Sequence, residues 1–186
     1  MYFKALDGPA GAQPDEDRLR EAITSHYELV WRTLRRLGVK EHSVEDAAQQ
    51  VLIVLSRRLT EVRPGAERAF MISTATRVAA DFRKKYSRAR EDLDPEALAA
   101  RASQSATVEE LIDRGRARDL LDLVLAGLPD ELRAVFVLFE FEDLTMATIA
   151  DMLELAPGTV ASRLRRARAL FETVALELST KRRLLP

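Results

Sequence analysis

Apolar residues recur at steps of three and four along most of this chain, which is the spacing of helices that bury one face. The first run predicts a helix that begins near Asp17 and ends at the stop signal Gly38. Its apolar positions are Ile23, Tyr27, Val30, Trp31, Leu34 and Leu37. Residues 1–17 are rich in Gly, Pro, Ala and Asp and lack this spacing, so we expect a flexible tail there.

Two more periodic runs follow before residue 90. Ser43, with Asp46 three positions later, resembles an N-terminal capping pair for a second helix, and Pro64 with Gly65 breaks the chain after it. A third helix is expected over residues 66–88. Its inward positions are Ile72, Ala75, Ala79 and Phe82, and its solvent-facing positions are Arg77, Arg83, Lys84, Lys85 and Arg88. Residues 18–90 are therefore predicted to form an N-terminal helical domain.

The remainder of the chain predicts a linker and a second helical domain. Residues 91–107 mix acidic residues with Pro, Ala and Ser and have weak periodicity, as linkers do. Helices are expected over residues 108–125 and 131–141, separated by the sequence LPD. No strand pattern, internal repeat or low-complexity tract stands out. The predicted fold is all-α, with two small helical domains joined by a linker.

The pattern after Thr145 predicts a helix-turn-helix within residues 108–186, because two periodic runs are separated by a very short connection. Thr145 can cap the first helix, and Pro157 suits the first turn of the second helix, where an N–H would lack a partner. The buried stripe of the second helix is expected to be Val160, Leu164, Ala167, Phe171 and Val174. Its opposite face carries Ala161, Ser162, Arg165, Arg166 and Ala169, with Arg163 and Arg168 on the flanks.

This face has the chemistry of a DNA-binding surface. Arg can donate to O6 and N7 of guanine in the major groove, and Ser can contact a base edge or a phosphate. The exposed amides of Gly158 and Thr159 could hold a phosphate at the start of the helix. The alternative is a helical hairpin whose Arg residues only keep it soluble.

Composition narrows the class of function. The chain has 186 residues, of which 47% are hydrophobic and 32% charged, and this suits a folded protein. It has no Cys and only two separated His, His26 and His42, so we expect no disulfide framework, no metal site and no other cofactor. No phosphate-binding Gly-rich loop, GxSxG or HExxH sequence is present, so an enzyme is not expected. The lack of a signal-like start or a long apolar stretch favours a cytoplasmic protein without membrane insertion.

Charge is unevenly distributed although the net charge is only −1. Residues 61–90 carry a net charge of +5, residues 91–154 a net charge of −11, and residues 155–186 a net charge of +5. Two basic segments separated by an acidic one suggest two contacts with a polyanion. Basic helix faces that are merely solvated remain the alternative on charge alone.

Two blocks of sequence resemble the extracytoplasmic-function (ECF) subfamily of bacterial sigma factors, within the sigma-70 family, over residues 21–178. The C-terminal block, LPDELRAVFVLFEFEDLTMATIADMLELAPGTVASRLRRARALF, is similar to region 4, which binds the minus-thirty-five promoter element. VEDAAQQVLIVLSRRL resembles the segment that binds the clamp helices of RNA polymerase. RAFMISTATRVAADFRKK resembles the segment that opens and reads the minus-ten element.

The resemblance implies three sets of contact residues. Core polymerase would contact Asp46, Gln49, Gln50 and Ile53. The minus-ten element would contact Arg63, Phe70, Arg77, Arg83 and Lys84, although Phe70 is equally well explained as a core residue. The minus-thirty-five element would contact Thr145, Pro157, Gly158, Thr159, Ala161, Ser162, Arg163, Arg165 and Arg166. The implied partners are core RNA polymerase, through its beta-prime clamp helices and beta flap, promoter DNA, and an anti-sigma factor.

The chain departs from the family pattern at five positions. Gln50 stands where Glu is usual, Ser56 where Trp or a similar residue is common, and Glu154 where the turn has Gly. Ala156 replaces a capping Ser, and Ala161 replaces a Lys or Arg, which predicts a looser turn and one groove contact fewer. Two functions therefore stay open: a sigma factor that directs promoter-specific initiation, or a sigma-like adaptor or decoy that binds protein partners without promoter recognition.

Overall fold

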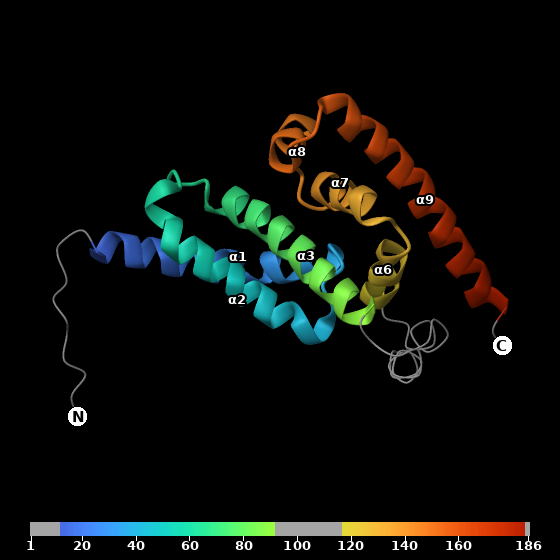
Figure 1. Ribbon diagram of the computed structural model, residues 1–186, viewed down its shortest axis with the longest axis horizontal. Helices are drawn as coiled ribbons and strands as arrows, with labels where there is room; N and C mark the ends of the chain where they lie inside the picture. The colour runs from blue at the N-terminus through green and yellow to red at the C-terminus, as the bar shows by residue number, and fades with distance from the viewer. Residues whose placement is uncertain (1–11, 92–116, 185–186) are drawn as a thin grey trace.

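The computed structural model describes residues 12–91 and 117–184, and every regular element in these ranges is helical. The N-terminal unit consists of α1 (Ala12–Arg36), α2 (Glu41–Arg58), the short 3-10 helix η1 (Leu59–Glu61) and α3 (Glu67–Glu91). The C-terminal unit consists of α6 (Ala117–Ala126), α7 (Asp130–Glu140), α8 (Met146–Leu153) and α9 (Pro157–Leu184). In Figure 1 the two units lie against each other, with α6 and α7 between the N-terminal helices and α9. The all-α prediction is confirmed over these ranges.

The core of the N-terminal unit is formed by the apolar stripes of α1, α2 and α3. Leu34, Val51 and Ile72, one from each helix, have no exposed surface. Of the positions predicted to face inward on α3, Phe82 alone is half-buried, and the others are buried. Each helix is amphipathic, and its apolar stripe is covered by the other two helices. The described helices include none with the length and apolar character required to cross a membrane.

The turn after α1 confirms the stop signal predicted at Gly38. Gly38 has a φ of +93°, a conformation that costs glycine little because it has no Cβ. The Gly38 N–H donates to the Arg35 carbonyl at 2.9 Å, and the Val39 N–H donates to the Leu34 carbonyl at 3.0 Å. These two bonds close a Schellman motif, which reverses the chain so that α2 packs back along α1.

Two helix starts differ from the sequence predictions. α1 begins at Ala12 and not near Asp17, so part of the predicted tail is helical; Asp15 lies in its first turn, where a negative charge is favourable. Residues 1–11 of that predicted tail lie outside the described residues. α2 begins at Glu41, and its N-cap residue Lys40 makes no side-chain capping bond, so the capping pair predicted at Ser43 is wrong. The tight turn at Gly38 brings the chain into helical geometry before Ser43 is reached.

The predicted linker falls almost wholly outside the described residues, as does the first part of the helix predicted over 108–125. The described part of that helix is α6, which ends at Ala126. The helix predicted over 131–141 is α7, shifted by one residue at each end, with Pro129 as its N-cap residue. The predicted boundary between the two domains therefore stays a prediction.

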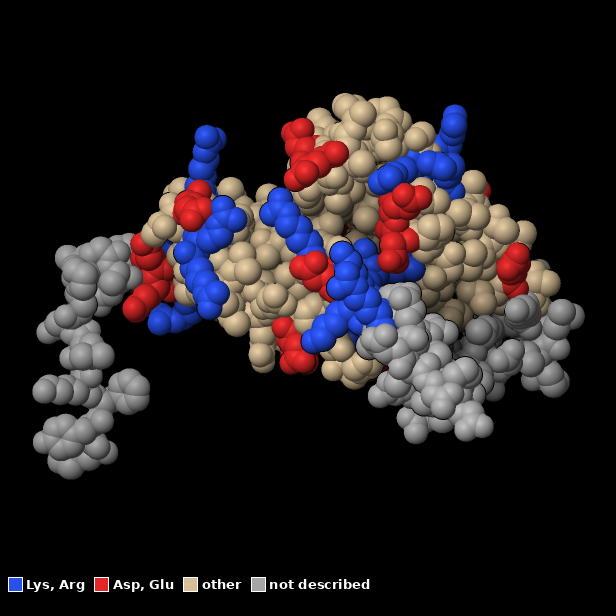
Figure 2. Space-filling model, in the orientation of Figure 1, with Lys and Arg blue, Asp and Glu red and all other residues tan. Residues whose placement is uncertain are grey.

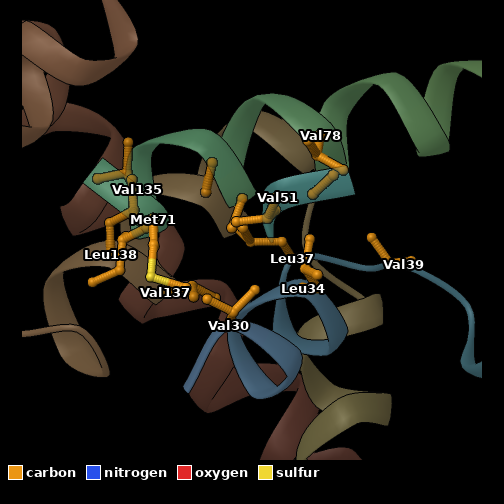
Figure 3. Packing of buried hydrophobic residues seen from close by; sticks show 14 of the residues in the cluster. Val30, Leu34, Leu37, Val39, Val51, Met71, Val78, Val135, Val137 and Leu138 are labelled. Atoms are coloured by element: carbon orange, nitrogen blue, oxygen red, sulfur yellow. The ribbon is translucent and has the colours of Figure 1, made fainter. Parts of the chain in front are cut away.

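α7 is buried around its whole circumference, from Leu132 to Leu138 without interruption. One side packs on α9, where the Phe136 and Phe171 rings stack with centroids 4.8 Å apart. The other side faces the N-terminal unit, and Figure 3 shows Val30 of α1 and Met71 of α3 beside Val137 of α7. A helix on the surface of a domain buries one stripe only. The burial of α7 on two sides therefore joins both units into one apolar cluster.

Candidate nucleic-acid interface

α8 and α9 form the predicted helix-turn-helix. The Thr148 N–H donates to Thr145 Oγ1 at 3.1 Å, so Thr145 caps α8 as predicted. Pro157 is the first residue of α9, also as predicted. The expected stripe of α9 packs inward, with Val160, Leu164 and Ala167 buried and its two later members half-buried. The small Ala150 of α8 is buried and lets the two helices approach closely.

The connection between the two helices is closed by Glu154 in a left-handed conformation. Its φ and ψ are 55° and 45°, and the following Leu155 N–H donates to the Ala150 carbonyl at 2.9 Å. This is the hydrogen bond of a tight helix-ending turn. A side chain in this conformation costs about 1–2 kcal/mol relative to Gly. The departure at Glu154 therefore adds backbone strain but does not open the turn, contrary to the looser turn that we expected.

The first turns of α9 present most of the residues predicted to contact the minus-thirty-five element. Thr145 at the start of α8 is exposed, and so are Pro157, Gly158 and Ala161. Thr159 and Ser162 are half-buried, and the Ser162 hydroxyl donates to the Thr159 carbonyl at 3.0 Å.

The four Arg residues in the first half of α9 fall into two pairs. Arg163 is half-buried and forms an ion pair with Glu131 of α7 at 3.0 Å. Arg168 forms an ion pair with Glu140 of α7 at 2.6 Å and lies over the Phe139 ring. Arg165 and Arg166 are exposed and make no ion pair with another described residue. The two flanking guanidinium groups thus hold α9 on α7, and the central two are available to a ligand.

The four residues predicted to contact polymerase share one exposed face of α2. All four are exposed, and they follow one another at steps of three, one and three residues along the helix: Asp46, Gln49, Gln50 and Ile53. The Ile53 side chain retains 47% of its surface exposed, which is a high value for an isoleucine. The face therefore offers an apolar centre with polar groups around it, an arrangement typical of protein-binding surfaces.

The predicted minus-ten residues do not form a single patch. Arg63 precedes α3 and Lys84 lies near its end, so about 25 Å of helix separates them; these two and Arg77 are exposed. Phe70 is half-buried against the core and has the Arg58 guanidinium 5.7 Å from its ring centroid. Phe70 thus contributes to the core of the N-terminal unit.

Arg83 does not face solvent, and the sequence prediction for it is wrong. It forms an ion pair with Asp130 at the start of α7 at 2.9 Å and donates to the Leu37 carbonyl. Its side chain is 18% exposed. The cause is the approach of α7 to α3, which places an acidic residue beside a helix position that would otherwise be on the surface.

Arg18 fixes the loop that carries Arg63. Its guanidinium donates to the Val62 carbonyl and to Glu67 Oε1, both at 2.6 Å, and to the Leu59 carbonyl at 3.2 Å. Burial acts to raise the pKa of Glu67, but its own backbone amide and the Arg18 guanidinium together hold that pKa below its ordinary value. The loop before α3 is therefore held by a charged side chain of α1, which the sequence did not indicate.

Sequence reasoning also missed a set of charged contacts between the two units. Arg35 of α1 pairs with Asp122 of α6 at 2.8 Å. Glu142, just after α7, has no exposed surface and accepts a hydrogen bond of 2.7 Å from the Thr33 hydroxyl. Figure 2 shows basic side chains gathered in separate groups, each with acidic side chains beside it. One signal was present in the sequence, because apolar residues cover every side of α7 and therefore require a second partner.

Comparison with known proteins places both units in one family. The sigma-70 region 2 profile matches residues 22–89, and the sigma-70 region 4 profile matches residues 118–171. The ECF RNA polymerase sigma factor SigE of Mycolicibacterium smegmatis is 29% identical over 161 residues, which cover 87% of this chain. The chain spans 62% of the length of that relative.

Two solved structures share the fold. The sigma factor RpoE of Bartonella quintana, in complex with the anti-sigma factor NepR, has a TM-score of 0.64 at 16% identity, covering 83% of this chain and 94% of RpoE. CnrH, in complex with the cytosolic domain of CnrY, has a TM-score of 0.58 at 20% identity, covering 84% of this chain and 86% of CnrH. Since regions 2 and 4 occur here in order and as the two helical units described above, the chain belongs to the sigma-70 family and is a member of its extracytoplasmic-function type.

Proposed function

We propose that this chain is a sigma factor that binds core RNA polymerase and directs promoter-specific initiation through sequence-specific DNA binding, with no catalytic activity of its own. The observation that carries the proposal is the exposed pair Arg165 and Arg166 on the second helix of the helix-turn-helix. Their neighbours Arg163 and Arg168 form ion pairs with Glu131 and Glu140 of α7. The positive charge of Arg165 and Arg166 is therefore left on the helix face that would enter the major groove.

The two units would act on different partners. The exposed face of α2 around Ile53 would dock on the polymerase clamp helices, while α3 and the loop held by Arg18 would engage the opened minus-ten element. The first turns of α9 would enter the duplex at the minus-thirty-five element, with the amides at Gly158 close to a phosphate. Family membership and the exposure of these faces support this division of roles.

The test is transcription with purified components. The chain is mixed with core polymerase and fragmented genomic DNA from the organism that encodes it, and transcript 5′ ends are sequenced to locate promoters. Arg165→Ala and Arg166→Ala should each weaken binding to the upstream duplex by about tenfold, within the range for a lost Arg contact to a base or phosphate. Arg168→Ala is the matched control, since it removes the same charge from the same helix outside the proposed contact.

A folded wild-type chain that yields no promoter-specific transcripts with active core enzyme would refute the proposal. Equal losses in Arg165→Ala and Arg168→Ala would refute the assigned DNA face. Ile53→Glu should remove polymerase binding while leaving affinity for the isolated duplex unchanged, which separates the two partner surfaces.

The second candidate is a sigma-like adaptor or decoy that binds protein partners without promoter recognition. It is favoured by the pairing of Arg83 with Asp130 and of Arg163 with Glu131, which removes two of the expected DNA contacts. The same transcription assay separates the candidates, because an adaptor would bind core enzyme without producing promoter-specific RNA.

An anti-sigma partner is part of the proposal as well. The two structural relatives are bound to NepR, an anti-sigma factor, and to the cytosolic domain of CnrY. Purification of the tagged chain from its own organism, followed by mass spectrometry, should identify a protein that blocks transcription when it is added back at equal concentration.

A further inference from the structure

The loop between η1 and α3 ends in a tight turn that stands clear of the rest of the protein. The Ala66 N–H donates to the Arg63 carbonyl at 2.9 Å, and Gly65 has a φ of +85°. Pro and Gly at the two central positions are the pattern of a type II turn. A Cβ added at Gly65 would meet no atom within 4 Å. Arg63, Pro64 and Gly65 are all exposed, so the tip of the turn is accessible to a ligand.

The base of this loop is held by Arg18 of α1 through all three guanidinium nitrogens. Nη1 and Nη2 donate to the Leu59 and Val62 carbonyls before the turn, and Nε donates to the Glu67 carboxylate after it. One side chain therefore ties the two ends of the loop together. The Arg18 and Glu67 side chains are 21% and 12% exposed, so water competes little for these bonds. Figure 1 shows the loop at the end of the N-terminal unit where α1 begins.

The Glu67 carboxylate extends this network into the turn itself. Besides Arg18, its own backbone amide and the Gly65 backbone amide are hydrogen-bonded to it. Glu67 is also the first residue of α3, where a negative charge is favourable. The end of η1, the turn and the start of α3 are thus connected through one ion pair. Within the described ranges Arg63 itself forms no ion pair, so its charge is left for a ligand.

A loop that already has its binding shape differs in two ways from a loose one. It gains affinity, because it need not be ordered when the ligand arrives. It also gains selectivity, because it cannot rearrange to suit a different ligand, whereas a loose loop adapts to several ligands and loses conformational entropy with each. The residue that fixes such a loop therefore affects binding without touching the ligand.

We propose that Arg18 is a positioning residue for recognition of the minus-ten element, because it fixes the loop from which Arg63 contacts the DNA strand. This inference rests on the proposed function. α1 carries none of the residues predicted to contact DNA, so it takes part in promoter selection only through this loop. Lysine is a poor replacement for Arg18, since a single ammonium group cannot span three acceptors arranged around a planar guanidinium.

The first experiment measures the mobility of the loop in the free chain. The sequence has no Cys, so Arg63→Cys provides a unique site for a nitroxide spin label at the turn. In an Arg18→Met background the rotational correlation time of the label should fall about twofold, because the loop loses three N–H donors. Arg18→Lys should give an intermediate value. An unchanged correlation time in Arg18→Met would overturn the proposal.

Two matched controls separate this effect from a general loss of stability. Arg20→Met removes the same charge from an exposed site of α1, where Arg20 pairs with Asp17 of the same helix. Val44→Ala truncates a buried side chain at the start of α2, away from the loop that follows its end. Both should leave the label unchanged, and circular dichroism verifies that each variant is folded. A change in Val44→Ala as large as that in Arg18→Met would count against the proposal.

The second experiment measures base selection by the complex with core polymerase. The probe is a single-stranded oligonucleotide with the minus-ten element of a promoter mapped in the transcription assay, together with versions in which one base is changed. Arg18→Met should lower the affinity about tenfold for the matched strand and about twofold for the changed strands, so the ratio between them falls about fivefold. Arg20→Met and Val44→Ala should keep the wild-type ratio. Equal losses on every strand would show a purely structural role and overturn the proposal.

Arg63→Ala tests whether Arg18 acts through the loop. In that background Arg18→Met should lower the affinity for the matched strand only about twofold, because the contact that it positions is already absent. An undiminished loss would mean that Arg18 acts by another route. Normal transcription with an unaltered ratio in Arg18→Met overturns this inference alone, while the proposed function stands. Absence of promoter-specific transcripts from the wild-type chain overturns both.

Discussion

Gly38→Ala is the substitution for which the structure gives the sharpest expectation. The left-handed backbone at Gly38, with a φ of +93°, makes any side chain strained there, at a cost of about 1–2 kcal/mol. An added Cβ would also overlap Arg133 Nη1 and lie 3.3 Å from both Arg133 Cζ and Arg83 Cδ. Gly38 belongs to the N-terminal unit and Arg133 to the C-terminal unit, so the substitution acts both on the turn after α1 and on the contact between the two units.

Arg133 cannot simply move aside. Its Nε donates to the Leu125 carbonyl at 2.7 Å, its Nη2 donates to the Leu128 carbonyl at 2.8 Å, and its Nη1 pairs with Asp130 at 3.2 Å. Burial lowers the pKa of Arg133, with Asp130 acting in the opposite direction, so the guanidinium depends on these partners. Loss of one charged hydrogen bond costs about 1.5–3 kcal/mol. The expected loss of unfolding free energy for Gly38→Ala is therefore about 2.5–5 kcal/mol in total.

A double-mutant cycle separates the two contributions. In an Arg133→Met background the obstructing guanidinium is absent, so Gly38→Ala should cost only the backbone strain of about 1–2 kcal/mol. Urea unfolding is followed by circular dichroism and by the fluorescence of Trp31, the one tryptophan of the chain. A coupling free energy below about 0.5 kcal/mol would mean that the two residues do not meet in solution, and the reasoning would then be refuted.

Three further predictions concern single elements. Arg18→Met should lower the unfolding free energy by about 2–3 kcal/mol, because two buried carbonyls and Glu67 lose their donor. In the wild-type chain the lowered pKa of Glu67 stabilises the folded state above the ordinary glutamate pKa, and this stabilisation is lost as the pH falls through the folded-state pKa. Urea unfolding between pH 7 and pH 3 should therefore show that the unfolding free energy falls less steeply with decreasing pH in Arg18→Met than in the wild type. Glu154→Gly should raise the unfolding free energy by about 1 kcal/mol through relief of left-handed strain, and an unchanged urea midpoint would contradict this. Thr145→Ala should lower it by about 1 kcal/mol through loss of the α8 cap, with Thr145→Ser as the variant that retains it.

The sequence predicted the helices well where an amphipathic stripe is covered by its own unit. The stripe of α9 and the cap at Thr145 depend on neighbours within a few turns, and both were predicted. The start of α2 was predicted three residues late because it depends on how tightly the chain reverses at Gly38. Helix starts are set by the geometry of the preceding turn as much as by capping residues.

The same distinction applies to the candidate site: features that follow from local helical spacing were predicted, and features that depend on distant contacts were not. The common face of Asp46 and Ile53 follows from helical spacing alone, and it is exposed as expected. The burial of Arg83 could not be predicted, since its partner Asp130 is 47 positions away and belongs to the other unit. The difference between Arg165 and Arg163 likewise depends on Glu131 of α7. Long-range ion pairs decide which basic side chains are free, and local sequence patterns do not contain that information.

The unbroken length of α9 has a mechanical consequence. The turns that carry Arg165 and Arg166 and the distal turns beyond Phe171 are parts of one rod of 28 residues, about 42 Å long. If such a rod tilts by about 10° about its far end, its other end is displaced by about 7 Å, a distance comparable with the roughly 8.5 Å depth of the major groove. A protein that grasps the distal turns could thus steer the Arg pair into or out of register with DNA without touching either residue.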